Sequence, residues 1–293
     1  MESIKNIDSI KVTNNGNEIT FVPEEITDAK SSPNRERLIL NILVDISSSM
    51  APRLQTVNEQ LNIFIKSIYN TRSDVEKILD ICVTTFGDST VKIIRPFGLI
   101  SEDDIDSFHL KKFDGTTPLG SAMLLAYKHC FDRKTQYDKE ETGLTALYRP
   151  IIVIISDFHD YDPLVAAVDG IEYGKEKKHS GKIYSEVAEL FSKLQDDLIK
   201  EITVLPIATD GTVNYNKELF GKLNPKEKYA YTPETGPFGI VLGNIFNALF
   251  ASMKKMIRIR EEDTDDTGLT YEQIQEKKMK NLDDILDNAL KDI

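Results

Sequence analysis

Residues 38–50, LILNILVDISSSM, decide the fold, because a run that is apolar except for Asn41 ends there in an acidic residue and three serines. A run without polar alternation is typical of a strand buried on both faces, as in the middle of a parallel sheet. The β-branched residues in this and similar runs favour strands over short buried helices. The other predicted strands are Ile78 to Phe86, Val91 to Ile94, Ile151 to Ile155 and Ile202 to Ile207.

Segments with apolar residues at helical spacing separate these runs. They span 54–68 and 183–198, while Thr117 and Pro118 are typical of a helix start and a fourth helix is expected from Phe238 to Met256. The short segment 85–90 predicts a hairpin turn and hence one antiparallel edge strand. We therefore expect a doubly wound, Rossmann-like α/β fold with a mostly parallel sheet and helices on both faces.

Three zones differ in composition. Residues 1–34 are polar and predict an appended hairpin around the turn at 14–17, and residues 35–256 form the α/β domain. Residues 257–293 combine an acidic linker with an amphipathic helix. That helix packs back on the same domain or is buried in a partner or a second copy, and the sequence leaves both open.

Charge and composition limit the classes of partner. The 293 residues carry 36 basic and 48 acidic side chains, a net charge of −12, which opposes direct nucleic-acid binding and favours cations or basic surfaces, or serves solubility alone. Two cysteines cannot build a disulfide scaffold, so we expect a cytoplasmic protein. The sequence shows no apolar run approaching the ~20 residues of a membrane span, so no membrane partner is expected.

Polar side chains gather in three loops, two of which follow predicted strands and one of which precedes a predicted helix. Asp45, Ser47 and Ser49 form D-x-S-x-S at a strand end, the loop at 114–120 adds threonine hydroxyls, and the loop at 154–160 adds acidic groups. In open α/β sheets the carboxyl ends of the strands form the ligand site, so these loops are expected to converge. Hydroxyl and carboxylate oxygens are the ligands of a hard divalent cation, Mg²⁺ or Mn²⁺, rather than zinc or copper.

These three segments, in this order, resemble the von Willebrand factor A (VWA) domain with its metal-ion-dependent adhesion site. The resemblance covers about residues 36–256, and G-T-T-P-L-G at 115–120 is similar to bacterial stand-alone members related to the tellurium-resistance TerY-like proteins. It implies a cytoplasmic protein-binding module in a bacterial stress-response or defence system. The metal ligands that it implies are Asp45, Ser47, Ser49, Thr117 and Asp157.

Two of these ligands are aspartates, which balance a divalent charge and leave a coordination position for an Asp or Glu of a protein partner. Thr116 is the alternative to Thr117, and Phe158 departs from the glycine that many relatives have after the aspartate.

Several other interpretations stay open. The serines and Thr117 are also common helix caps. A metal-dependent phosphatase or phosphotransfer enzyme would use Asp45 as its nucleophile, but Ser47 replaces the second aspartate that supplies the general acid. A scaffold that assembles through its C-terminal helix would carry a vestigial site. We expect no catalysis, and the sequence leaves the oligomeric state open.

Overall fold

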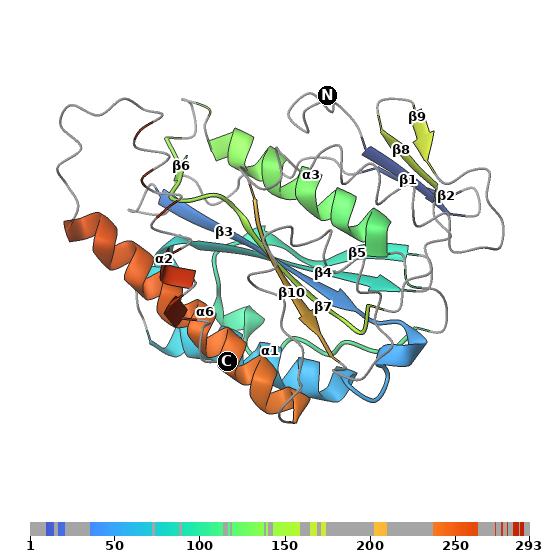
Figure 1. Ribbon diagram of the computed structural model, residues 1–293, viewed down its shortest axis with the longest axis horizontal. Coiled ribbons are helices and arrows are strands. Elements are labelled where there is room, and N and C mark those ends of the chain that lie inside the picture. The colour runs from blue at the N-terminus through green and yellow to red at the C-terminus, as the bar shows by residue number, and fades with distance from the viewer. Residues whose placement is uncertain are drawn as a thin grey trace.

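The run that contains Leu40 forms β3 (Glu36–Asp45), the middle strand of the central sheet (Figure 1). The computed structural model describes residues 10–14, 17–20, 36–71, 74–87, 90–113, 117, 119–137, 139, 143–158, 165–168, 171–173, 202–209, 237–262, 273, 277, 280, 284–286 and 288–289. Every residue of β3 after Glu36 is buried, as expected for a strand covered on both faces.

The central sheet is mixed, as predicted. Its order is β10 (Thr203–Ala208), β7 (Ile151–Ser156), β3, β4 (Leu79–Gly87) and β5 (Thr90–Gly98). Neighbouring strands from β10 to β4 are parallel, whereas β5 returns antiparallel to β4. The short β6 (Thr145–Ala146) pairs with the start of β3. The parallel pairing brings the carboxyl ends of β3 and β7 to the same edge.

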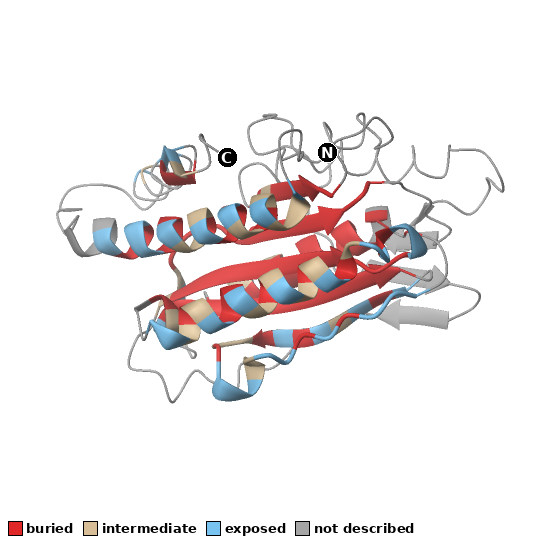
Figure 2. Cartoon of the chain, turned by 90° about the horizontal axis from the view of Figure 1, so that it is seen from below, coloured by how far each residue is buried: buried red, intermediate tan, exposed pale blue. Residues whose placement is uncertain are grey.

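Helices cover both faces of this sheet, as Figures 1 and 2 show. The even-numbered β3 residues from Leu38 to Val44 join the core beneath α1 (Leu54–Asn70), α2 (Asp74–Ile78) and α6 (Phe238–Glu262). The odd-numbered Ile39 and Leu43 join a second core beneath α3 (Leu119–Tyr137). The period of two in a strand thus divides one apolar run between two cores.

The predicted N-terminal hairpin forms, but it belongs to a second sheet. β1 (Ile10–Asn14) pairs antiparallel with β2 (Asn17–Thr20) and, on its other edge, with β8 (Val165–Val168), which continues to β9 (Ile171–Tyr173). The hairpin is therefore tied to a segment far away in the chain rather than appended alone. Figure 1 places this sheet at the end of the molecule toward which β3 and β4 point.

The C-terminal segment packs on the same domain. Ile285 and Leu286 are buried in the core that α1 and α6 share. The structure therefore favours the first of the two alternatives for this helix. The helix predicted at 183–198 lies outside the described residues.

α6 corrects two expectations. It continues to Glu262, beyond the predicted end at Met256. Residues Phe238–Arg258 are also long and apolar enough to cross a membrane, with a mean hydropathy of 1.2. The expectation that no segment approaches the length of a membrane span is therefore corrected. The buried side of α6, including Phe246 and Met253, packs in the core against α1, and Phe246 stacks on Phe64. A helix that covers a sheet meets the same criteria of length and hydropathy.

A buried ion pair lies beneath α3. Arg133 Nε donates to Asp80 Oδ2 at 2.8 Å, and both residues are at most 5% exposed. Tyr137 also donates its hydroxyl hydrogen to Asp80. The charge of the Asp80 carboxylate is thus compensated by two side chains that lie one turn apart on α3.

Arg133→Met is expected to lower the free energy of unfolding by about 3–5 kcal/mol, because it leaves the Asp80 carboxylate buried without its cation. Urea unfolding measures the loss. The double variant Arg133→Met/Asp80→Leu removes both charges and is expected to recover part of that loss. Additive losses in the double variant would contradict this account of the pair.

Candidate metal site

At the end of β3, Asp45 and Ser47 are buried, whereas Ser49 is exposed. Asp45 is fully buried, and its Oδ1 accepts the Ser47 backbone N–H at 2.8 Å. Ser47 Oγ lies 3.1 Å from Ser49 Oγ. The structure therefore places the three D-x-S-x-S side chains together, as the sequence predicted.

The two serines do not cap α1, which begins after Arg53. Ser47 precedes the 3-10 turn Ser48–Met50, but its side chain makes no capping hydrogen bond there. The capping interpretation is therefore wrong for Ser47.

Neighbouring backbone holds this loop in place. The Ile46 N–H donates to Phe86 O at the end of β4 at 2.9 Å, and Ile46 O accepts the Phe113 N–H at 2.8 Å. Gly87 approaches so closely that a Cβ there would lie 3.0 Å from Ser47 N. The position of the serines thus depends on the next strand of the sheet and on the segment that contains Phe113.

The end of β7 supplies the second half of the site. Ser156 Oγ donates to Asp45 Oδ2 at 2.7 Å and accepts the Phe158 N–H at 2.9 Å. Ser156 was not among the predicted site residues, although it immediately precedes Asp157 at the end of a predicted strand. Ser156 connects the two strand ends whose aspartates are the predicted ligands.

Phe158 has a backbone φ of +54°, the left-handed region that favours glycine. Its side chain is fully buried in the core beneath α3. The chain therefore keeps the backbone conformation of a glycine at the position where Phe158 departs from the family pattern. Burial of the ring offsets the conformational cost.

Burial dominates the electrostatics of Asp45. It raises the pKa of Asp45 to about 6, against the lowering effect of hydrogen bonds from Ser156 and Ser47, and the nearby charge of Asp157 raises it further. Asp157 is only 2% exposed. Among the described residues, no basic side chain pairs with Asp45. Two carboxylates thus lie close together where neither is readily hydrated.

Thr117 lies next to the start of α3 and is 5% exposed. In the described part of the chain no hydrogen bond joins it to the other four predicted ligands, so its role stays a prediction. Thr116, its alternative, and His159 lie outside the described residues.

The donor set fits a hard divalent cation. The buried Asp45 carboxylate has no basic partner among the described residues, so a bound cation would supply the missing positive charge. The serine hydroxyl oxygens would complete an all-oxygen set of ligands. The described residues contain no cluster of three or more His, Cys, Asp or Glu side chains that could hold a metal. The donor set of this loop is therefore that of a hard divalent cation rather than that of a thiolate or imidazole site.

Comparisons with known proteins define the fold. No protein-family model matches the chain, and no curated protein matches it. The pilus adhesin SpaC from Lactobacillus rhamnosus GG matches with a TM-score of 0.50 and 13% identity, over 76% of this chain and 31% of the adhesin. The SpRpn10 VWA domain matches with a TM-score of 0.40 and 12% identity, over 71% of this chain and 94% of the domain. Manganese-loaded TRAP of Plasmodium vivax also has a TM-score of 0.40, with 19% identity over 71% of each chain.

The fold is a Rossmann-like mixed sheet with one antiparallel edge strand and helices on both faces, and the chain shares this fold with the pilus adhesin. The chain spans about a third of the pilus adhesin that it matches. At these identities the likeness concerns the fold alone.

Asp45→Asn is expected to stabilise the protein in EDTA at neutral pH, because it removes a buried charge without changing the size of the side chain. A folded-state pKa of about 6, above the ordinary 3.8, means that the folded wild type binds more protons than the unfolded chain between these values. Stability of the wild type should therefore fall as pH rises from about 4 to about 6. Urea unfolding across this range should show a smaller slope for the variant, and equal slopes would contradict the assignment.

Gly87→Ala is expected to weaken divalent-cation binding, because the added Cβ pushes against Ser47 N and displaces the serine loop. Calorimetric titration with Mn²⁺ measures the change. Gly143→Ala is the control, since Gly143 also has a positive φ, +61°, but its Cβ would meet nothing within 4 Å. Equal cation affinity in the two variants would show that the loop tolerates the displacement.

Proposed function

We propose that this chain is a metal-dependent protein-binding module. Its cation, Mg²⁺ or Mn²⁺, is held by Asp45, Ser47, Ser49, Thr117 and Asp157. The observation that carries the proposal is the buried Asp45 carboxylate, which is close to the charge of Asp157 and has hydrogen-bond donors but no basic partner among the described residues. A carboxylate kept in such a place at a cost in stability is typical of a functional site.

The residues of the chain have distinct tasks in this proposal. Ser156 and the Ser47 N–H orient the two oxygens of Asp45, and the bonds of Ile46 to β4 and to Phe113 keep the serine hydroxyls at the sheet edge. When bound, the cation supplies a coordination position that a carboxylate oxygen of a partner protein can fill. The partner's recognition then depends on the rim around the loop.

Binding rather than catalysis is part of the proposal. Ser47 stands where a phosphotransfer enzyme of this sheet type has its second aspartate, so the general acid is missing from that position. The scaffold alternative is weakened by the burial of Ile285 and Leu286 in the domain's own core, since these apolar side chains are not available to a partner.

We also propose that the module works in the cytoplasm within a bacterial stress-response or defence system. This finer assignment is supported by the similarity of residues 115–120 to the TerY-like group and by the small number of cysteines.

Millimolar Mg²⁺ or Mn²⁺ is expected to raise the melting temperature of the wild type above its value in EDTA. A cation at ~100 times its dissociation constant adds about 2.7 kcal/mol, roughly 5–10 °C for a domain of this size. Asp45→Ala and the double variant Ser47→Ala/Ser49→Ala should lose this gain. No shift in the wild type at any cation concentration would refute the metal site, and turnover of an aryl phosphate that Asp45→Asn abolishes would favour the enzyme.

A further inference from the structure

A cavity of about 540 Å³ lies beside the proposed metal loop, between the edge strand β5 and the segment 103–113. Ile46, which stands between Asp45 and Ser47, contributes to its wall. Phe113, on the opposite wall, donates its N–H to Ile46 O. The cavity and the metal loop thus share a residue and a hydrogen bond.

Part of the cavity wall is apolar, and the cavity is open to solvent. Phe108 and Leu110 are buried in its wall, whereas Ile94 is 38% exposed and Phe113 is 53% exposed. These last two are among the four large apolar side chains that are exposed in the described part of the chain. Their concentration in one groove indicates an apolar partner.

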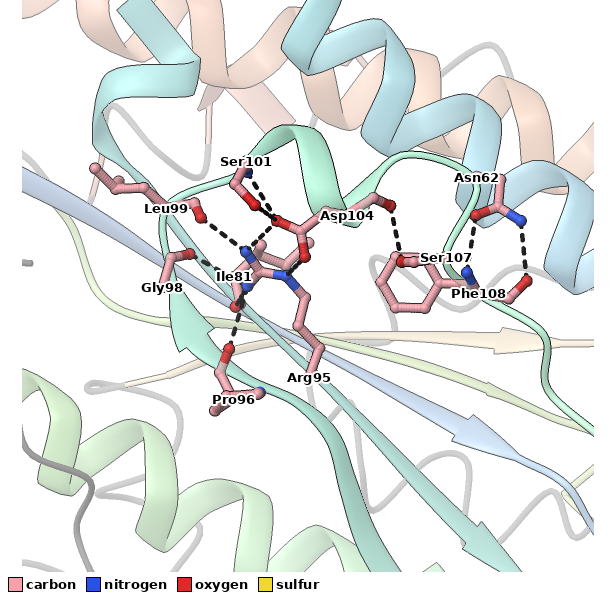
Figure 3. A network of polar contacts seen from close by, with 10 residues as sticks. All are labelled: Asn62, Ile81, Arg95, Pro96, Gly98, Leu99, Ser101, Asp104, Ser107 and Phe108. Carbon is pink, nitrogen blue, oxygen red and sulfur yellow. Dashed lines mark hydrogen bonds and ion pairs between the residues drawn. The ribbon is translucent and has the colours of Figure 1, made fainter. Parts of the chain in front are cut away.

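One wall of the groove is held in an extended conformation from behind. Asn62 on α1 accepts the Phe108 N–H at 3.1 Å and donates to Phe108 O at 3.0 Å, and Asn58 binds Leu110 in the same way at 2.7 and 3.0 Å (Figure 3 shows the Asn62 pair). Alternate residues of an extended segment direct their backbone groups to opposite sides. The backbone groups of His109 and Lys111 therefore face away from α1.

The opposite wall is a sheet edge. β5 ends the order of the central sheet, and no backbone hydrogen bond joins it to 107–113 among the described residues. One end of the groove is fixed by Arg95, whose guanidinium binds Asp104 and the carbonyl oxygens of Gly98 and Leu99 (Figure 3). Burial would raise the pKa of Asp104, but Arg95 together with the Ser101 N–H lowers it below its ordinary value. Two backbone edges thus flank the cavity without pairing with each other.

The charge of the groove is opposite to that of the whole protein. Lys92 and Lys111 line it, are exposed, and form no ion pair with another described residue, although the chain carries a net charge of −12. Lys92 pairs in register with Thr85 of β4, next to Phe86, and Lys111 lies two residues before Phe113. Both lysines are therefore on the side of the groove toward the metal loop. Asp103 and Asp104 are at the other end, and Arg95 compensates the charge of Asp104.

We propose that this groove binds an extended segment of the partner protein in which apolar and acidic residues alternate. The segment lies along β5 as an added strand, places apolar side chains against Ile94 and Phe113, and places carboxylates near Lys92 and Lys111. The inference rests on the proposed function in one respect, namely that the partner in the groove is the partner of the metal loop. The groove recognises the extended segment through contacts with its main chain and with alternate side chains, and these contacts do not depend on the cation.

The test uses two synthetic pools of eight-residue peptides, one alternating Ile, Val, Leu or Phe with Asp or Glu, the other with Lys or Arg in the acidic positions. The full chain is expected to bind the acidic pool at least 10-fold more tightly in fluorescence anisotropy. Hydrogen exchange should show added protection in 90–98 and 107–113. Binding of neither pool, equal binding of both, or protection elsewhere would overturn the proposal. Protection of these segments that depends only on protein concentration would identify a second copy and also overturn it.

The double variant Lys92→Glu/Lys111→Glu is expected to lose the preference for the acidic pool. Lys254→Glu/Lys255→Glu, on exposed positions of α6, makes the same change in net charge and should keep it. Equal losses in both variants would show that only net charge matters and would overturn the proposal. Both variants should keep the melting-temperature gain with Mg²⁺, whereas absence of that gain with intact peptide binding would refute the metal site alone.

Discussion

The central constraint in this protein is one buried carboxylate at the end of its middle strand. Asp45 is buried there because β3 is covered on both faces. At the ends of the neighbouring strands, Ser156 donates a hydrogen bond to the Asp45 carboxylate, and Phe86 O accepts one from the next residue, Ile46. Burial raises the pKa of Asp45 to about 6, so the fold maintains the charged form at a cost that a cation would remove. The loop, its hydrogen bonds and the close approach of Gly87 all serve to keep this carboxylate and two serines at one edge.

The same arrangement connects the metal loop to a second surface. Ile46 is held between β4 and the segment that contains Phe113, and it forms part of the wall of the groove along β5. A partner that contacts both places would need a carboxylate for the loop and an extended apolar and acidic segment for the groove. Two linked contacts on one sheet edge would bind the partner more tightly than either contact alone.

Much of the fold and of the metal loop could be predicted from the sequence, because apolar runs and helical spacing indicate which residues are buried. The strands around Leu40 and Val153 and the grouping of Asp45 with Ser47 and Ser49 follow from local pattern. Pairing between distant segments does not, so the contact of β1 with β8 and the burial of Leu286 against α6 required the structure. Ser156 was missed because a serine at a strand end has no distinctive spacing, and the groove was missed because its walls come from segments that share no motif.

Electron paramagnetic resonance of Mn²⁺ added to the full chain tests the central claim most directly, because it counts bound ions and reports their ligands. The account predicts one site per chain with an all-oxygen coordination sphere in the wild type, and no such site in Asp45→Asn. A bound ion that persists in Asp45→Asn with an unchanged spectrum, or the absence of any bound ion in the wild type, would contradict the assignment of this loop as the metal site.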